Sequence, residues 1–280
     1  MKMPVPDNYK RYMVLPLILL VLSIGFLGFK TFSGGLDLSI DLEGGTQLTL
    51  EMKEKVDISE IKSILSDFPT NIRSSDTFSG QTILIETDSE RVSEIMTILD
   101  SKYEIEGWSQ QTVGPTLGNS FFSQSQLALV LAFIAMAIVV FIIFRVFMPS
   151  LYVVFAAFAD IIETLAFSQL IGIELSLPTF AALLLLLGYS VDTDVLLTTR
   201  ILKSRGDLKD KIRKAMTTGL TMTITTLVAL TVLFLVAGNE VIRQIAAVLI
   251  IGLVFDAFNT WIMNINLLRM YVEKHPEKVR

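Results

Sequence analysis

Apolar residues gather in six long stretches, which a polar block of about ninety residues divides one and five. The stretches cover residues 13–29, 127–144, 151–171, 177–197, 217–237 and 241–268. An α-helix needs about twenty apolar residues to cross the ~30 Å hydrocarbon core of a bilayer. The pattern therefore predicts a polytopic α-helical membrane protein with six transmembrane helices.

The polar block between the first two stretches alternates strand and helix patterns. Residues 46–52 alternate apolar and polar with period two, as a half-buried strand does. Capping signatures at Asp57 and Thr87 each precede apolar residues at helical spacing. Three further strand patterns lie at residues 71–76, 81–87 and 103–113. The order strand, helix, strand, strand, helix, strand predicts an α+β domain of the ferredoxin-like type.

Basic residues predict the orientation and the domain boundaries. They concentrate at Lys2, Lys10 and Arg11, in the loop 200–216, and at Lys274, Lys278 and Arg280. By the positive-inside rule, both termini and this loop are cytoplasmic, so the large loop is extracytoplasmic. We therefore expect residues 1–33 to form the N-terminus and first helix, 34–122 the extracytoplasmic domain, 123–271 helices two to six, and 272–280 a cytoplasmic tail.

The composition agrees with a multi-pass protein of the cell membrane and narrows its chemistry. Hydrophobic residues make up 52% of the chain and charged residues 18%, and the mean hydropathy is +0.60. The chain has no cysteine, and its one histidine, His275, lies in the polar tail. The sequence also has no phosphate-binding loop. We therefore expect no metal site, no cofactor and no enzymatic activity.

The polar block is acidic, with sixteen acidic and six basic residues between positions 36 and 120. Nucleic acid is not expected as a partner, because phosphate binding needs clustered Lys and Arg. Two interpretations remain open: a solvated acidic surface, or a surface that binds unfolded, partly basic polypeptide.

Carboxyl groups inside the apolar stretches are the main functional candidates, because a charge in hydrocarbon is costly and marks an ion or proton path. Asp160 and Glu163 lie three residues apart and share a helical face, whereas Asp192 and Asp194 project from different faces. Burial and a neighbouring carboxylate both favour the protonated form of a carboxyl group. The candidates for ion or proton coupling are Asp192, Asp160, Glu163, Asp256 and Asp194. Alternatively, these groups only hydrogen-bond neighbouring helices, and Asp194 faces the cytoplasmic interface.

Three motifs carry a family resemblance. Asp41-Leu-Glu-Gly44-Gly45-Thr follows the first stretch, and the pair of glycines suits a sharp entry into the first strand. The fourth stretch begins Leu-Pro178-Thr-Phe-Ala-Ala-Leu and continues with Gly188-Tyr189-Ser-Val-Asp, where Gly188 is expected to allow close helix packing. These motifs resemble the signatures of the SecD and SecF protein-export family, in the same order and over essentially the whole chain. The single six-helix half favours SecF, and Val-Asp-Thr-Asp looks archaeal.

The resemblance implies the fold of the resistance-nodulation-division transporters and a role as an accessory subunit of the Sec translocon. The implied partners are SecD, the protein-conducting channel, the translocating unfolded polypeptide and membrane lipid. In bacterial relatives a proton gradient drives the work. Many bacterial SecF chains carry Asn-Asp where this chain has Asp192-Thr193, and bacterial SecF has a fifth-helix Arg where the best match here is Thr218. Alternatives are a half-size exporter of small molecules or lipids from the same superfamily, and an assembly scaffold without coupling.

Overall fold

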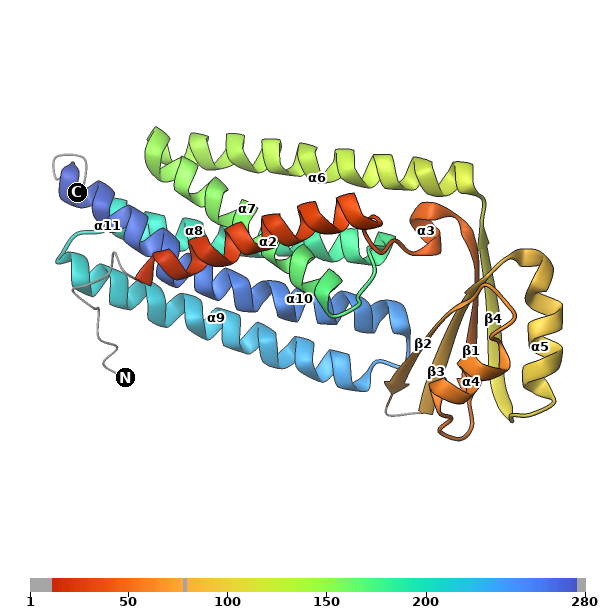
Figure 1. The fold of residues 1–280 in the computed structure, drawn as a ribbon. Coiled ribbons are helices and arrows are strands. Elements are labelled where there is room, and N and C mark those ends of the chain that lie inside the picture. Colours follow the sequence, from red (N-terminus) through yellow and green to blue (C-terminus); the bar gives the residue numbers. More distant parts are fainter. Residues whose placement is uncertain (1–11, 78–79, 276–280) are drawn as a thin grey trace.

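The computed structural model describes residues 12–77 and 80–275. The basic residues expected to mark the two termini, Lys2, Lys10, Arg11, Lys278 and Arg280, lie outside the described residues. Figure 1 shows a bundle of long helices with a four-stranded sheet at one end. The sheet lies between the bundle and helix α5 (Val92–Asp100).

Six helices are long and apolar enough to cross a membrane, which confirms the predicted number. The sixth is continuous through a π-helical segment, labelled η2, that joins α10 to α11. The bounds are α2 (Val14–Ser33), α6 (Pro115–Phe144), α7 (Phe147–Leu170), α8 (Leu177–Lys203), α9 (Leu208–Val236), α10 (Glu240–Phe258), η2 (Asn259–Asn264) and α11 (Ile265–Lys274).

Two predicted boundaries are corrected by the helices. Helix α6 begins at Pro115, in the first turn where proline is favoured, so the boundary expected at residue 122 falls inside it. The basic loop expected at residues 200–216 is only the segment 204–207, because α8 continues to Lys203 and α9 starts at Leu208. Polar residues at both places extend helices beyond their apolar stretches.

The domain between α2 and α6 has the predicted order of elements. We call residues 40–113 the sheet domain. Its strands lie in the order β2-β3-β1-β4 and every neighbouring pair is antiparallel, as in a ferredoxin-like fold. The elements are α3 (Ile40–Glu43), β1 (Gly45–Met52), α4 (Ile58–Ile64), β2 (Asn71–Thr77), β3 (Gly80–Thr87), η1 (Ser89–Arg91), α5 and β4 (Ile105–Val113).

The two predicted caps have different outcomes. The Asp57 carboxylate accepts a hydrogen bond from the Ser59 amide at 2.9 Å and caps α4. The cap expected at Thr87 does not form: Thr87 is the last residue of β3, and its hydroxyl makes no hydrogen bond within the described residues. The 3₁₀ turn η1 follows before α5 begins. The helices α4 and α5 cover one face of the sheet, and Leu48, Ile85 and Ile95 are among the side chains buried between them.

A close glycine contact joins the sheet domain to helix α6. Gly44 and Gly45 have φ angles of +86° and +141°, which confirms the sharp entry into β1. A Cβ atom on Gly118 of α6 would lie 2.7 Å from the Gly44 nitrogen, so the backbones touch here. The sheet domain is therefore seated directly on the first turns of α6.

Candidate functional site

A group of polar side chains lies at the centre of the helix bundle, among α7, α8 and the α10–η2 segment. Each member is fully buried, and four of them carry carboxyl groups. Asp160 is near the middle of α7, well inside the apolar part of the helix. We call this group the carboxyl cluster, and its members are Asp160, Glu163, Ser190, Asp194, Asp256, Asn259, Thr260 and Asn264.

On one side of the carboxyl cluster, Asp160 binds both neighbouring helices. Ser190 Oγ of α8 donates to Asp160 Oδ2 at 2.5 Å. Asn259 Nδ2 donates to Asp160 Oδ1 and to Glu163 Oε2, each at 2.8 Å. The pair on α7 thus shares one partner, as expected for residues three apart on one helical face.

On the other side of the carboxyl cluster, Asp194 binds two side chains of η2. Thr260 Oγ1 lies 2.9 Å from Asp194 Oδ1 and 3.3 Å from Asp256 Oδ1. Asn264 Nδ2 donates to Asp194 Oδ1 at 2.7 Å. The expectation that Asp194 faces the cytoplasmic interface is therefore wrong, since its side chain is fully buried.

The π-helical segment η2 explains how one helix supplies so many donors. In an α-helix, residues five apart project about 140° apart, because each residue turns the chain by about 100°. The i→i+5 hydrogen bonds of a π-helix bring such residues closer to one face. Asn259 and Asn264, five apart at the two ends of η2, both reach carboxyl groups. Sequence analysis missed Ser190, Thr260 and Asn264. The available signal was that two asparagines, Asn259 and Asn264, lie within an apolar stretch.

The hydrogen bonds described above reach the carboxyl groups only from neutral side chains. Within the part of the chain that the structure describes, several buried acceptors make no hydrogen bond, including Glu163 Oε1, Asp194 Oδ2 and Asp256 Oδ2. A buried carboxylate without a cationic partner is strongly unfavourable. The carboxyl cluster is therefore a place where protons or a cation must balance the charge.

Asp192 does not join the carboxyl cluster. It is exposed on the outside of α8, because residues two apart on an α-helix project about 200° apart. The neighbouring Gly188 is also exposed, and a Cβ atom there would meet nothing within 4 Å. Residues 12–77 and 80–275 therefore do not make the close packing expected at Gly188. An ionisable side chain at this depth is unfavourable against lipid.

The first residues of the fourth-helix motif form the start of α8. Ser176 and Thr179 form a capping box at the start of α8, with Pro178 in the first turn. Tyr189 is half-buried, and its hydroxyl makes no hydrogen bond within the described residues.

In the first motif, Asp41 accepts a hydrogen bond from Gln111 Nε2 of β4 at 2.8 Å. Burial raises the pKa of this carboxyl group.

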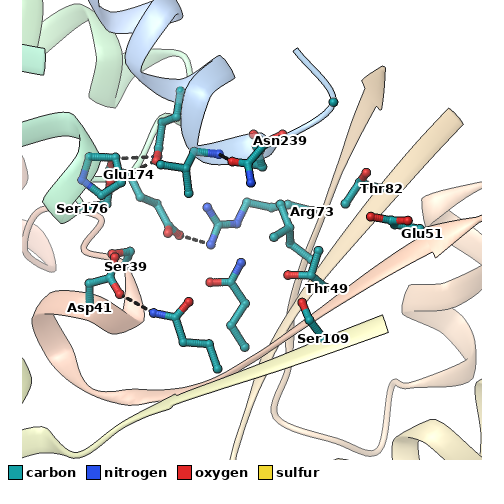
Figure 2. A pocket seen from close by; sticks show the side chains of 18 residues that line it. Ser39, Asp41, Thr49, Glu51, Arg73, Thr82, Ser109, Glu174, Ser176 and Asn239 are labelled. Atoms are coloured by element: carbon teal, nitrogen blue, oxygen red, sulfur yellow. Dashed lines mark hydrogen bonds and ion pairs between the residues drawn. The ribbon is translucent and has the colours of Figure 1, made fainter. Parts of the chain in front are cut away.

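A second polar site lies where the sheet domain meets the bundle. A cavity of about 320 Å³ separates the open face of the sheet from the ends of α8 and α10. Figure 2 shows Arg73 reaching from the sheet towards Glu174, a residue of the α7–α8 loop. The other charged residues that line the cavity are Asp41, Glu51 and Glu240. We call this space the junction cavity.

Arg73 holds two carboxylates at the junction cavity. Its Nη2 atom lies 2.5 Å from Glu86 Oε1 and 2.5 Å from Glu174 Oε1. The Glu174 side chain is only 8% exposed. Burial, with the neighbouring Glu86, raises the pKa of Glu174 to about 7 although Arg73 favours the ionised form. Glu174 therefore changes its charge near neutral pH. Arg73, Glu86 and Glu174 come from separate parts of the sequence, so sequence analysis did not predict that they meet.

Comparison with known proteins gives a consistent result. The family pattern described as "Protein export membrane protein SecD/SecF, C-terminal" matches residues 84–274. The pattern described as "SecD/SecF GG Motif" matches residues 31–56. The second match contains Asp41, Gly44 and Gly45, and Gly44 is the residue of the three that lies against α6.

Similar proteins cover nearly the whole chain. The "Protein-export membrane protein SecF" of Methanolacinia petrolearia is 44% identical over 95% of this chain and 94% of its own length. The protein of the same name from Methanocaldococcus jannaschii is 37% identical over 97% of this chain and 98% of its own.

Two solved structures of SecDF share the fold. SecDF from Thermus thermophilus, described as a translocon-associated membrane protein, superimposes with a TM-score of 0.77 at 21% identity, over 96% of this chain. SecDF in a "Super-membrane-facing form" gives a TM-score of 0.63 at 20% identity over 99% of this chain. The present chain spans about two fifths of those chains, 39% and 40%.

Proposed function

Because this chain belongs to the SecF proteins of the SecD/SecF protein-export family, we propose that it promotes protein translocation as an accessory subunit of the Sec translocon. Its partners are SecD, the protein-conducting channel, the translocating polypeptide and membrane lipid. The work is coupled to protons or another ion that binds at the carboxyl cluster. The sheet domain lies on the extracytoplasmic side, where it meets the emerging polypeptide, and both termini are cytoplasmic.

The observation that carries the proposal is the carboxyl cluster itself. Four fully buried carboxyl groups receive hydrogen bonds from neutral side chains, and several of their oxygen atoms have no donor. When a carboxylate takes up a proton, it gains a hydrogen-bond donor and loses its negative charge. When it releases the proton, the donor is lost and the buried charge returns. Three helices supply the groups, so a change in protonation alters the contacts among α7, α8 and α10–η2. Such a site performs work when the two protonation states favour different helix arrangements.

The exposed side chain of Asp192 supports the partnership with SecD. A carboxyl group on the outside of a bundle, at membrane depth, is stable only against a polar group or water. The structural neighbour SecDF, of which this chain matches 39%, supports SecD as the partner on this face. Asp192 and Gly188 therefore mark the face of α8 that meets SecD.

Pulse-chase export of a secreted protein tests the function. Cells without the gene receive wild type, Asp160→Asn, Asp194→Asn or the control Asp210→Asn, at matched membrane levels. Asp210 is exposed and pairs with Arg213 at the start of α9, away from the carboxyl cluster. Both cluster variants should slow export about tenfold, equal to ~1.4 kcal/mol in a barrier, while SecD still co-purifies. Normal export in both variants would instead indicate a scaffold without coupling.

A further inference from the structure

The α7–α8 hairpin connects the carboxyl cluster to the sheet domain. Helix α7 carries Asp160 and Glu163, and α8 carries Ser190 and Asp194. The loop between these helices, residues 171–176, lies at the end of the bundle next to the sheet. A shift of α7 against α8 at the cluster therefore displaces this loop.

The loop is tied to the segment that leads into the sheet domain. Leu38 and Leu175 form a parallel β-bridge, in which the Ser39 amide donates to Leu175 O at 2.9 Å and the Leu175 amide donates to Asp37 O at 2.8 Å. The side chain of Gln169, 3% exposed, accepts from the Asp37 amide at 2.8 Å and donates to Asp37 O at 3.1 Å. In this attachment every hydrogen bond ends on the backbone of residues 37–39, close to the chain connection.

The second attachment reaches the sheet itself and consists of side chains. Glu174 pairs with Arg73 of β2, and Arg73 also holds Glu86 of β3. The backbone oxygen of Glu174 lies 3.4 Å from Gln244 Nε2 of α10, so the loop also contacts the third helix of the carboxyl cluster. Glu174 is thus the residue where the hairpin, α10 and the sheet meet.

The junction cavity leaves room for the sheet to move. Polar side chains of β1, β3 and β4 line it on the sheet side, including Gln47, Thr49 and Ser109. Apolar packing therefore does not fix the sheet face to the bundle across this space. An ion pair that bridges such a gap can break and form again at little cost in buried apolar area.

We propose that the Arg73–Glu174 ion pair is a latch between the sheet domain and the α7–α8 hairpin, and that it opens and closes during each round of translocation. This inference rests on the proposed function, since it supplies the step by which the carboxyl cluster acts on the sheet domain. Arg73 and Glu174 are positioning residues. When the ion pair is formed, it holds the helix-free face of the sheet over the bundle. When the ion pair is broken, the sheet is free to move away.

Chemical locking of the junction tests the movement. The chain has no cysteine, so introduced pairs react alone. Leu84→Cys with Ile171→Cys places thiols on β3 and on the loop beside the latch, where both residues line one pocket with Arg73 and Glu174. Leu84 pairs with Arg73 across β2 and β3, so the two side chains share the open face of the sheet. A bismaleimide then joins sheet and hairpin with the ion pair intact. Ser93→Cys with Thr97→Cys, both on α5, gives a matched cross-link inside the sheet domain.

In membrane vesicles, cross-linking Leu84→Cys to Ile171→Cys should reduce translocation at least tenfold, whereas the α5 cross-link and each single cysteine with reagent should not. Translocation at the wild-type rate with the junction locked would overturn the latch. The result is distinct from failure of the proposed function: if Asp160→Asn and Asp194→Asn slow export while the locked protein works, only the latch is wrong. If those two variants work normally, the coupling function is wrong.

Charge exchange tests the pair itself. Arg73→Glu and Glu174→Arg alone should each slow translocation several-fold, and the double variant should recover part of the loss, because the attraction is restored with reversed signs. Glu240→Gln, in the same cavity, is the control for loss of a negative charge. A double variant no better than either single variant would contradict a specific Arg73–Glu174 contact.

Discussion

The side-chain amide of Asn259 lies between Asp160 and Glu163 and donates a hydrogen bond of 2.8 Å to each carboxyl group. Both hydrogen atoms of the amide are used, one for each partner. A change in the charge or position of one carboxyl group therefore alters the hydrogen bond to the other. Asn259 also begins η2, so it links α7 to the π-helical segment.

Replacing Asn259 by Leu should destabilise the protein by about 2–6 kcal/mol, because two buried carboxyl groups each lose a donor at about 1–3 kcal/mol. Thermal unfolding of the purified protein measures the loss. Ser123→Ala is the control, since its hydroxyl donates to the backbone of its own helix on an exposed face. An Asn259→Leu variant as stable as Ser123→Ala would show that these hydrogen bonds do not hold the carboxyl cluster together.

The seat of the sheet domain on α6 predicts a strong effect of one methyl group. Alanine at Gly118 would place a Cβ atom 2.7 Å from Gly44 N, against backbone that cannot yield. The expected loss is about 1–3 kcal/mol, as for overpacked sites. Gly114→Ala, where a Cβ atom meets nothing within 4 Å, should change the unfolding temperature little. Equal unfolding temperatures for the two variants would contradict the close contact.

The exposed face of α8 predicts an effect on assembly. Asp192→Leu should reduce co-purification of SecD several-fold, because it removes the polar group that meets the partner, whereas Asp192→Asn should retain more. Thr231→Leu on α9 is a matched control, since that hydroxyl donates to its own helix at Leu227 O on an exposed face. Undiminished co-purification with Asp192→Leu would place the SecD contact elsewhere.

The junction cavity predicts a pH-dependent contribution of Glu174 to stability. Its pKa is about 7 in the folded protein and 4.5 when exposed, so the folded state binds the proton more tightly. The stability of wild type relative to Glu174→Gln should therefore fall as pH rises from about 4.5 to 7, by ~3 kcal/mol at 1.36 kcal/mol per pH unit. The charged groups around it are Arg73 and Glu86 on the sheet, and Asp41, Glu51, Glu240 and Arg243 among the residues that line the adjoining cavities.

Unfolding midpoints of the two proteins between pH 5 and 8 measure this difference. A difference that stays constant, or that grows in favour of wild type with rising pH, would show that Glu174 is ionised throughout this range in the folded protein.

Periodicity in the sequence predicted what depends on local order: the six helices, the alternation of β1 and the order of elements in the sheet domain. It also placed Asp160 and Glu163 on one face of α7. The π-helical segment could not be predicted, because it depends on packing between distant helices. The Trp261 ring fills the space beside Gly219 of α9, where a Cβ atom would lie 2.1 Å from the ring.

The candidate site was predicted in part for the same reason. Which face of α8 is buried depends on where α7 and α10 pack, so the sequence could not show that Asp194, and not Asp192, joins the carboxyl cluster. Likewise, Glu174 and Arg73 belong to different domains and only the fold brings them together. The function of each of these residues stays a prediction.

Ion uptake measured together with translocation tests the central claim most directly. Vesicles that contain this chain, SecD and the channel are loaded with a pH-sensitive dye. Substrate polypeptide is then added outside the vesicles under a proton gradient. We predict proton movement that rises with translocation in wild type and in Asp210→Asn, and that is lost in Asp160→Asn and Asp194→Asn. If protons do not move, the same vesicles with a sodium gradient and a sodium-sensitive dye test the other ion. Translocation that proceeds at the wild-type rate in both cluster variants, with neither ion moving, would contradict ion coupling at the carboxyl cluster.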